Sequence, residues 1–236
     1  KRFSIHDTPH KMINEIIFPC VIKPIFLSAS RGVIRVNTIE ELAYGIKTLN
    51  ELLSLEEVRE REGKQSDWIL VEEYIPGKEV AIEGIVAEGK LKVLAVFDKP
   101  EPMEGPTFEE TIIVTPTALS EKNQFSLFET AQNAVKALGI VKGPVHVEVR
   151  INSSGNYILE CASRSIGGLC SKVLEFQGGM SLEELILRSY LGRNVVKTKL
   201  TDTARGVMMM PTENMGILKE MRGVEDALNV RGVTDL

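Results

Sequence analysis

Two segments of the sequence alternate apolar and polar residues on either side of a short turn, which is the pattern of an antiparallel β-hairpin. Residues 78–99 turn at Glu88-Gly89, and residues 143–160 turn at the three small residues Ser153-Ser154-Gly155. Successive side chains of a strand point to opposite faces, so each hairpin has one apolar face to bury. The sequence therefore predicts an antiparallel sheet that needs helices to cover it.

Three segments carry the signals of such helices. Residues 37–63 and 120–139 have apolar residues at helical spacing behind a capping Asn, Thr or Ser, and residues 181–192 repeat the pattern. The order of these elements predicts an α+β fold with two lobes. We expect the lobes at residues 1–66 and 67–236, with the break near residues 64–70.

Composition excludes several classes of protein. The formal net charge is −5, from 28 Lys and Arg against 33 Asp and Glu, which disfavours a nucleic-acid-binding surface. Three cysteines without CxxC spacing indicate neither disulfides nor a zinc site and favour a cytoplasmic protein. No apolar run approaches the ~20 residues of a membrane span.

The second hairpin concentrates charge. If it closes symmetrically about Ser154, Glu148 lies opposite Glu160, with side chains that start ~5 Å apart and repel. A Mg²⁺ ion between them removes the repulsion, and Arg164 follows closely enough to contribute positive charge. The alternative is a surface hairpin with solvated acids, which the apolar flanks and the Gly167-Gly168 exit disfavour.

Lys23 interrupts an apolar strand, where an unpaired ammonium is costly. A phosphate partner would explain it, because the loop at 28–32 supplies small residues, backbone N–H groups and Arg31. No P-loop motif is present. An edge-strand lysine that reaches water remains an equal alternative.

The segment LVEEYIPGKEV runs from a strand into a Pro-Gly turn. Its backbone at 72–75 could meet an adenine edge, and Glu79 beyond the turn could reach ribose hydroxyls. An ordinary strand-to-hairpin connection is the alternative for this segment on its own.

Together, FPCVIKP, SRGV, ILVEEYIPGKEVAIEG and GPVHVEVR…YILECASRSIGG resemble the ATP-grasp superfamily over residues from about 18 to the end. The carboxylate–amine ligase branch with the L-amino-acid ligases is most similar, and biotin carboxylase and the carbamoyl phosphate synthase large chain are more distant. The resemblance implies an ATP-grasp fold, cytoplasmic location, ATP and Mg²⁺ or Mn²⁺ as cofactors, and activation of a carboxylate as an acyl phosphate for attack by an amine.

The resemblance also implies roles for individual residues. Arg164 would be catalytic, Glu148 and Glu160 would bind metal, and the nucleotide would be bound by Lys23, Ser28, Ser30, Arg31, Gly32, Glu72, Glu73, Tyr74, Ile75 and Glu79. Substrate-side contacts are expected from Glu109, Glu110, His146, Gly167 and Gly168. Small-molecule carboxylate and amine substrates are the expected partners, and a homodimer is compatible with the resemblance.

Two departures from the family pattern stand out. Many relatives have Asn where this chain has Ala162, so one metal ligand is absent and a water could take its place. Relatives also carry a further N-terminal domain, which we expect to be absent from this sequence. The run at 207–211 fits a core strand or a substrate wall, and its composition favours the core.

Two other functions remain open. A bicarbonate-activating enzyme of the biotin carboxylase or carbamoyl phosphate synthase type would use the same scaffold, although the acidic FEET segment disfavours it. The second open alternative is a catalytically incomplete ATP-binding module.

Overall fold

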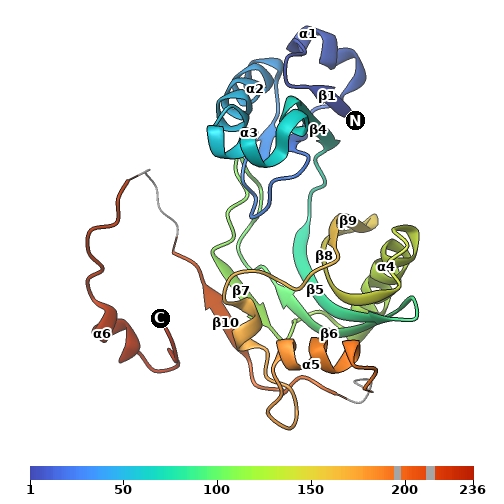
Figure 1. The fold of residues 1–236 in the computed structure, drawn as a ribbon, viewed down its shortest axis with the longest axis vertical. Coiled ribbons are helices and arrows are strands. Elements are labelled where there is room, and N and C mark those ends of the chain that lie inside the picture. The colour runs from blue at the N-terminus through green and yellow to red at the C-terminus, as the bar shows by residue number, and fades with distance from the viewer. Residues whose placement is uncertain (194–197, 211–215) are drawn as a thin grey trace.

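The computed structural model describes residues 1–193, 198–210 and 216–236. Its strands form two antiparallel sheets that lie one above the other in Figure 1. The first sheet has four strands in the order β1-β4-β2-β3, namely β1 (Arg2–Ser4), β4 (Trp68–Glu73), β2 (Cys20–Pro24) and β3 (Ile34–Val36). The α+β class expected from the sequence is confirmed.

The strand β4 corrects the expected boundary between the lobes. The expected boundary after residue 66 places β4 in the second lobe, but β4 pairs with β1 and β2 in the first sheet. Ile69 and Val71 point into the core of that sheet, where both are buried. The chain passes to the second sheet only after Glu73, because the apolar side of β4 is buried with the first core.

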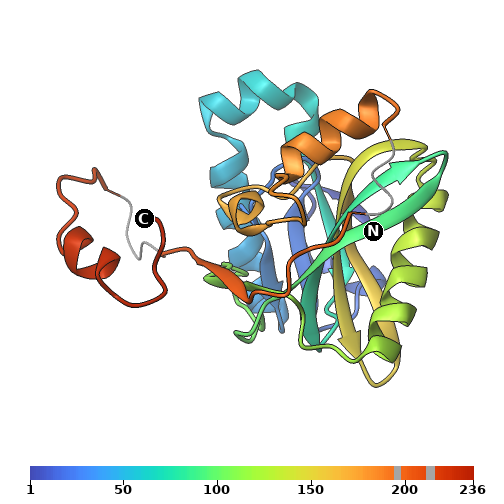
Figure 2. The ribbon, with the colours of Figure 1, turned by 90° about the horizontal axis from the view of Figure 1, so that it is seen from below.

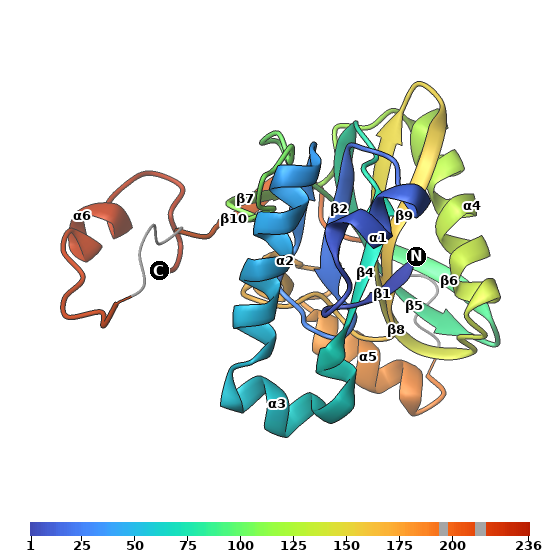
Figure 3. The same cartoon turned by 90° about the horizontal axis from the view of Figure 1, so that it is seen from above.

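Helix α2 (Ile39–Leu53) covers the first sheet, as Figure 3 shows. The Thr38 hydroxyl caps it by accepting a hydrogen bond from the Glu41 N–H at 3.2 Å. Gly45 lets the helix approach β2 closely, because a Cβ atom there would lie 2.6 Å from Ile22 Cδ1. The predicted helix 37–63 is divided, with α3 (Glu56–Glu62) as its second part.

The second sheet has six strands in the order β10-β7-β6-β5-β8-β9. The long central strands are β5 (Lys78–Ala87), β6 (Lys90–Asp98) and β8 (Lys142–Asn152). The outer strands are β7 (Ile112–Thr115), β9 (Gly155–Ala162) and β10 (Arg205–Met208). Each pairs antiparallel with its neighbours, as the hairpin pattern predicts.

Helices lie on both faces of this sheet (Figure 2). Helix α4 (Glu121–Ala137) covers the face that carries Val80, Val147 and their neighbours, and its Leu127 is fully buried there. Helix α5 (Leu182–Tyr190) packs on the opposite face with Phe97 and Phe176. Remaining helical segments are α1 (Pro9–Met12), α6 (Val224–Leu228) and the 3₁₀ turns Ile13–Glu15, Gly63–Asp67 and Cys170–Val173.

The turns of the two hairpins differ from expectation in one case. Glu88 and Gly89 form the first turn with positive φ, as predicted. In the second hairpin Asn152 pairs with Gly155, so the turn has two residues, Ser153 and Ser154, rather than three. A register shift further along the hairpin compensates for the shorter turn.

The C-terminal part of the chain contributes less to the core. Val207 and Met209 pack on the second core, whereas Met208 and Met210 are exposed, and Pro211 of the predicted run lies outside the described residues. Helix α6 stands apart from both sheets in Figure 1. Within the described residues, no helix has the length and apolarity to cross a membrane.

Candidate active site

A cavity of about 900 Å³ lies between the two sheets and is open to solvent. Strand β2 and the loop after it line one side, and the hairpin of β8 and β9 lines the other. Most residues singled out from the sequence face it: Lys23, Ser28, Ser30, Arg31, Glu72, Glu73, Tyr74, Ile75, Glu79, Glu148, Glu160 and Arg164.

Lys23 lies on β2, which is an interior strand between β4 and β3. The edge-strand alternative is therefore wrong. Its ammonium forms an ion pair with Glu72 on β4, and the side chain of Lys23 is only 25% exposed. The lysine is thus paired in the structure and still borders the cavity.

The loop at 28–32 has an unusual backbone. Ala29 and Ser30 both have positive φ, at 58° and 54°, and the Val33 N–H donates to the Ser30 carbonyl at 3.0 Å. Arg31 reaches α3, where Nη2 lies 2.7 Å from Glu57 Oε1. Gly32 does not line the cavity; a Cβ atom there would lie 2.8 Å from Leu52 Cδ2, so its place is against α2.

Tyr74 marks the passage between the sheets. The Arg35 guanidinium lies 3.9 Å from the centre of its ring, and the Arg150 guanidinium lies 5.7 Å from it. Arg150 also donates to the carbonyls of Ile75 at 3.3 Å and Gly77 at 3.4 Å. This buried arginine therefore fastens the crossing segment to β8.

Arg150 was not predicted, although the strand period could have indicated it. It follows His146 and Glu148 at intervals of two on β8, so the three side chains share the face away from the buried valines. Its Nε donates to Glu79 Oε2 at 2.7 Å. Both oxygens of Glu79 accept hydrogen bonds from buried cations, Oε1 from Lys99 and Oε2 from Arg150. These bonds disfavour the expected contact of Glu79 with the ribose, which stays a prediction.

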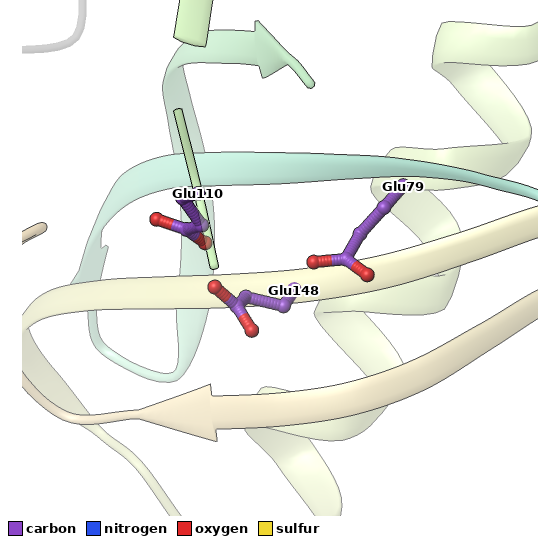
Figure 4. Close-up of side chains that lie close together, drawn as sticks. All are labelled: Glu79, Glu110 and Glu148. Carbon is purple, nitrogen blue, oxygen red and sulfur yellow. The ribbon is translucent and has the colours of Figure 1, made fainter. Parts of the chain in front are cut away.

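A second residue missing from the sequence-based set is Lys99, directly after β6. Its ammonium lies 2.5 Å from Glu79 Oε1 and 3.0 Å from Glu148 Oε1, and it also pairs with Glu110. Figure 4 shows these three glutamates converging. Burial alone lowers the pKa of Lys99, but the three carboxylates outweigh it and raise the pKa above its usual range.

The same charges act on the glutamates. Burial tends to raise the pKa of Glu148, but His146 and Lys99 outweigh it and hold the pKa well below its usual range. Glu148 is therefore an anion at neutral pH. Burial raises the pKa of Glu110 despite the neighbouring ammonium.

His146 links Glu148 to another buried carboxylate, Glu83 on β5. Nδ1 of His146 contacts Glu83 and Nε2 lies 3.3 Å from Glu148 Oε1. Burial lowers the pKa of His146, but hydrogen bonds with both glutamates outweigh it and raise the pKa to about 9. The other oxygen of Glu83 accepts from the Ile166 N–H at 3.0 Å, two residues beyond Arg164. Glu83 was not predicted either.

Glu148 pairs with Glu160 across the hairpin, as the sequence predicts. Arg164 Nη2 lies 3.6 Å from Glu160 Oε1, and the two side chains are about half exposed. Ala162 pairs with His146 and offers no side-chain oxygen. Among the described residues Glu148 Oε2 accepts no hydrogen bond, so Glu148 and Glu160 both offer carboxylate oxygens that fit a hard cation such as Mg²⁺.

The remaining substrate-side residues are less well placed. Glu109, Gly167 and Gly168 are exposed, and a Cβ atom at either glycine would meet nothing within 4 Å. The space beside both glycines is open among the described residues, and the approach of a substrate there stays a prediction. Glu110 and His146 do not line the cavity itself. His146 contacts Glu148 directly, and Glu110 is linked to Glu148 through Lys99.

Fold and site together define a two-sheet α+β protein with a charged cavity between the sheets. A family model described as an ATP-grasp domain matches residues 16–173, so the chain belongs to the ATP-grasp family. This confirms the resemblance inferred from the sequence.

Several relatives are ligases. The alanine–anticapsin ligase of Bacillus subtilis (strain 168) is 26% identical over 201 residues, which cover 79% of this chain and 42% of that protein. The D-alanine–D-alanine ligase of Flavobacterium johnsoniae is 28% identical over 188 residues, covering 74% and 52%. A solved L-amino acid ligase from Bacillus licheniformis matches with a TM-score of 0.76 and 25% identity, covering 100% of this chain and 56% of that one. The chain thus spans about half the length of these relatives.

Proposed function

We propose that the protein is an ATP-dependent ligase that activates a carboxylate as an acyl phosphate and joins it to an amine. The observation that carries this proposal is the cavity, which brings Lys23 and Arg31 opposite Glu148, Glu160 and Arg164. Relatives with peptide-forming or amino-acid ligase names support it. We further propose that the sheets and their helices form two lobes that enclose the nucleotide.

The nucleotide would lie with its phosphates against β2. Lys23, Arg31 and the N–H groups of the loop at 28–32 supply positive charge and donors for a polyphosphate. The backbone from Glu72 to Ile75, with Tyr74 held between two arginines, would border the adenine. We therefore assign this side of the cavity to ATP.

Glu148 and Glu160 would hold Mg²⁺ or Mn²⁺, which supplies charge neutralisation at the phosphates when bound. The substrate carboxylate oxygen attacks the γ-phosphorus, and ADP leaves with the bridging oxygen. The amine nitrogen then attacks the acyl carbon, loses a proton and expels phosphate as the C–N bond forms. Arg164 would stabilise the negative charge in both steps through its guanidinium donors.

For an amino-acid substrate, we propose Glu110 as the partner of the ammonium group. Lys99 pairs with its Oε1, and Oε2 has no hydrogen-bond partner in the part of the chain that the structure describes. Glu110→Gln should raise the KM for the amino acid much more than the KM for ATP. Equal effects on both KM values would contradict this assignment.

An ADP-release screen of the complete protein tests the proposed function. Pairs of amino acids and other carboxylates are supplied with ATP and Mg²⁺, and the ligated product is identified by mass. ADP release that depends on bicarbonate instead would indicate a carboxylase-type enzyme. Nucleotide binding without any turnover would indicate a binding module.

Two further properties belong to the same proposal. Free cysteines and dependence on ATP favour a cytoplasmic location. A homodimer is compatible with the family resemblance, and sedimentation of the complete protein measures its mass directly.

A further inference from the structure

Lys99 has an almost fully buried ammonium next to Glu79 and Glu148, which line the cavity, and only 3% of its side chain is exposed. It comes directly after β6, and its three acidic partners come from β5, the segment before β7, and β8. An ammonium group has three N–H donors, and here it meets three carboxylates. The group is thus fully satisfied by residues that are far apart in the sequence.

The carboxylates need this cation. One oxygen from each of Glu79, Glu110 and Glu148 lies within 4.8 Å of the others, and carboxylates that close together repel. In Figure 4 the three side chains point toward a common centre. The Lys99 ammonium contacts all three carboxylates, so it offsets their repulsion as a bound metal cation would.

Lys99 also decides which oxygen of Glu148 is available. Lys99 and His146 both contact Oε1 of Glu148, at 3.0 Å and 3.3 Å. The other oxygen, Oε2, accepts no hydrogen bond from any described residue. Glu148 lines the cavity, so one oxygen is held by protein and the other is left for a ligand.

We infer that Lys99 is a positioning residue, a built-in cation that gathers Glu79, Glu110 and Glu148 and turns one oxygen of Glu148 toward the cavity. The inference rests on the proposed function for its catalytic consequence, but not for its effect on cation binding. Glu79 in turn holds Arg150, which fastens the segment at 75–77. Lys99 is therefore connected to the segment between the two sheets through its ion pair with Glu79 and the contacts of Arg150.

The test replaces Lys99 in the complete protein. In Lys99→Met the three carboxylates lose their common partner, and we expect Mn²⁺ to bind among them without nucleotide. Mn²⁺ titration by calorimetry should show a binding event that the unaltered protein lacks. Lys99→Met/Glu79→Gln should lose this binding event, because one of the three ligands is no longer charged.

A second readout separates positioning from stability. ADP formation in Lys99→Met should fall about 10- to 100-fold, with an altered Mg²⁺ requirement and little change in the KM for ATP. Lys99→Arg, which keeps the charge, should recover part of the rate. Lys90→Met, an exposed lysine at the start of the same strand, is the matched control and should behave as the unaltered protein.

If Lys99→Met does not fold, Lys99→Gln serves in its place, because it keeps polar contacts without the charge. A folded variant with unaltered Mn²⁺ binding and unaltered Mg²⁺ requirement overturns the inference. If the unaltered protein forms no ADP with any substrate, the proposed function fails, and the Mn²⁺ titration still decides the role of Lys99.

Discussion

Glu148 lies opposite Glu160 in the hairpin of β8 and β9 because an unpaired residue, Leu159, offsets the two-residue turn. Val149 pairs with Ile158 and Glu148 with Glu160, so Leu159 is the extra residue of a β-bulge. A two-residue turn without the bulge would have placed Leu159 opposite Glu148. The bulge thus brings the carboxylates together at the cavity wall.

Glu160→Gln should reduce ADP formation by about 100-fold or more, because charge stabilisation of several kcal/mol at the metal would be lost. Folding should be unaffected, since the Glu160 side chain is 52% exposed. Steady-state ADP release measures the effect. Glu129→Gln, an exposed glutamate on α4, is the matched control, and turnover equal to that control would refute the metal role.

Arg164→Ala should lower kcat by about 10²- to 10³-fold, the usual effect of removing a donor to transition-state charge. The KM for ATP should change little, because the adenine and loop contacts remain. Within the described residues the guanidinium makes exposed contacts alone, with Glu160 and the Ser165 carbonyl, so the melting temperature should stay the same. A folded variant with undiminished turnover contradicts the assignment.

Arg150→Met should destabilise the fold by about 3–5 kcal/mol, because it leaves the buried Glu79 carboxylate with one cation fewer. Both residues are almost fully buried, at 3% and 6% exposed. Urea denaturation gives the free energy of unfolding. The double variant Arg150→Met/Glu79→Gln should recover part of the lost free energy of unfolding. If it recovers none, the arginine stabilises the fold mainly through its hydrogen bonds to the carbonyls of Ile75, Gly77 and Met103.

Asp98 should make the stability depend on pH. Burial raises its pKa, but hydrogen bonds from Thr117 and the Ala118 N–H and the ion pair with Lys78 outweigh it, so the net pKa is lowered. A carboxyl whose pKa is lower in the folded state stabilises above its unfolded value of about 3.9, and this contribution is lost as the pH falls further.

Asp98→Asn should therefore cost about 1–3 kcal/mol at pH near 7 and progressively less below pH near 4. Urea denaturation of both proteins across this range provides the comparison. An equal difference at neutral and acidic pH would contradict the role of the charge.

Local patterns in the sequence determined much of the fold. The period-two pattern on β8 separated Val147 from His146 and Glu148, and Thr38 and Ser120 mark the starts of α2 and α4. These features depend on residues within a few positions of one another, so the sequence carries them directly. The pairing of Glu148 with Glu160 was predicted correctly from an incorrect turn, since a symmetric hairpin cannot indicate a bulge.

Only the tertiary structure decided how the charges pair. Lys99 meets Glu79 across 20 positions of sequence and Glu148 across 49. No periodicity relates residues so far apart, because their contact depends on the order of strands within the sheet. The same reason hid the place of β4, whose partners β1 and β2 precede it by whole elements. The sequence by itself determined most strands, the helix starts and many of the charged residues of the cavity wall, and the packing of the sheets decided which ammonium holds which carboxylate.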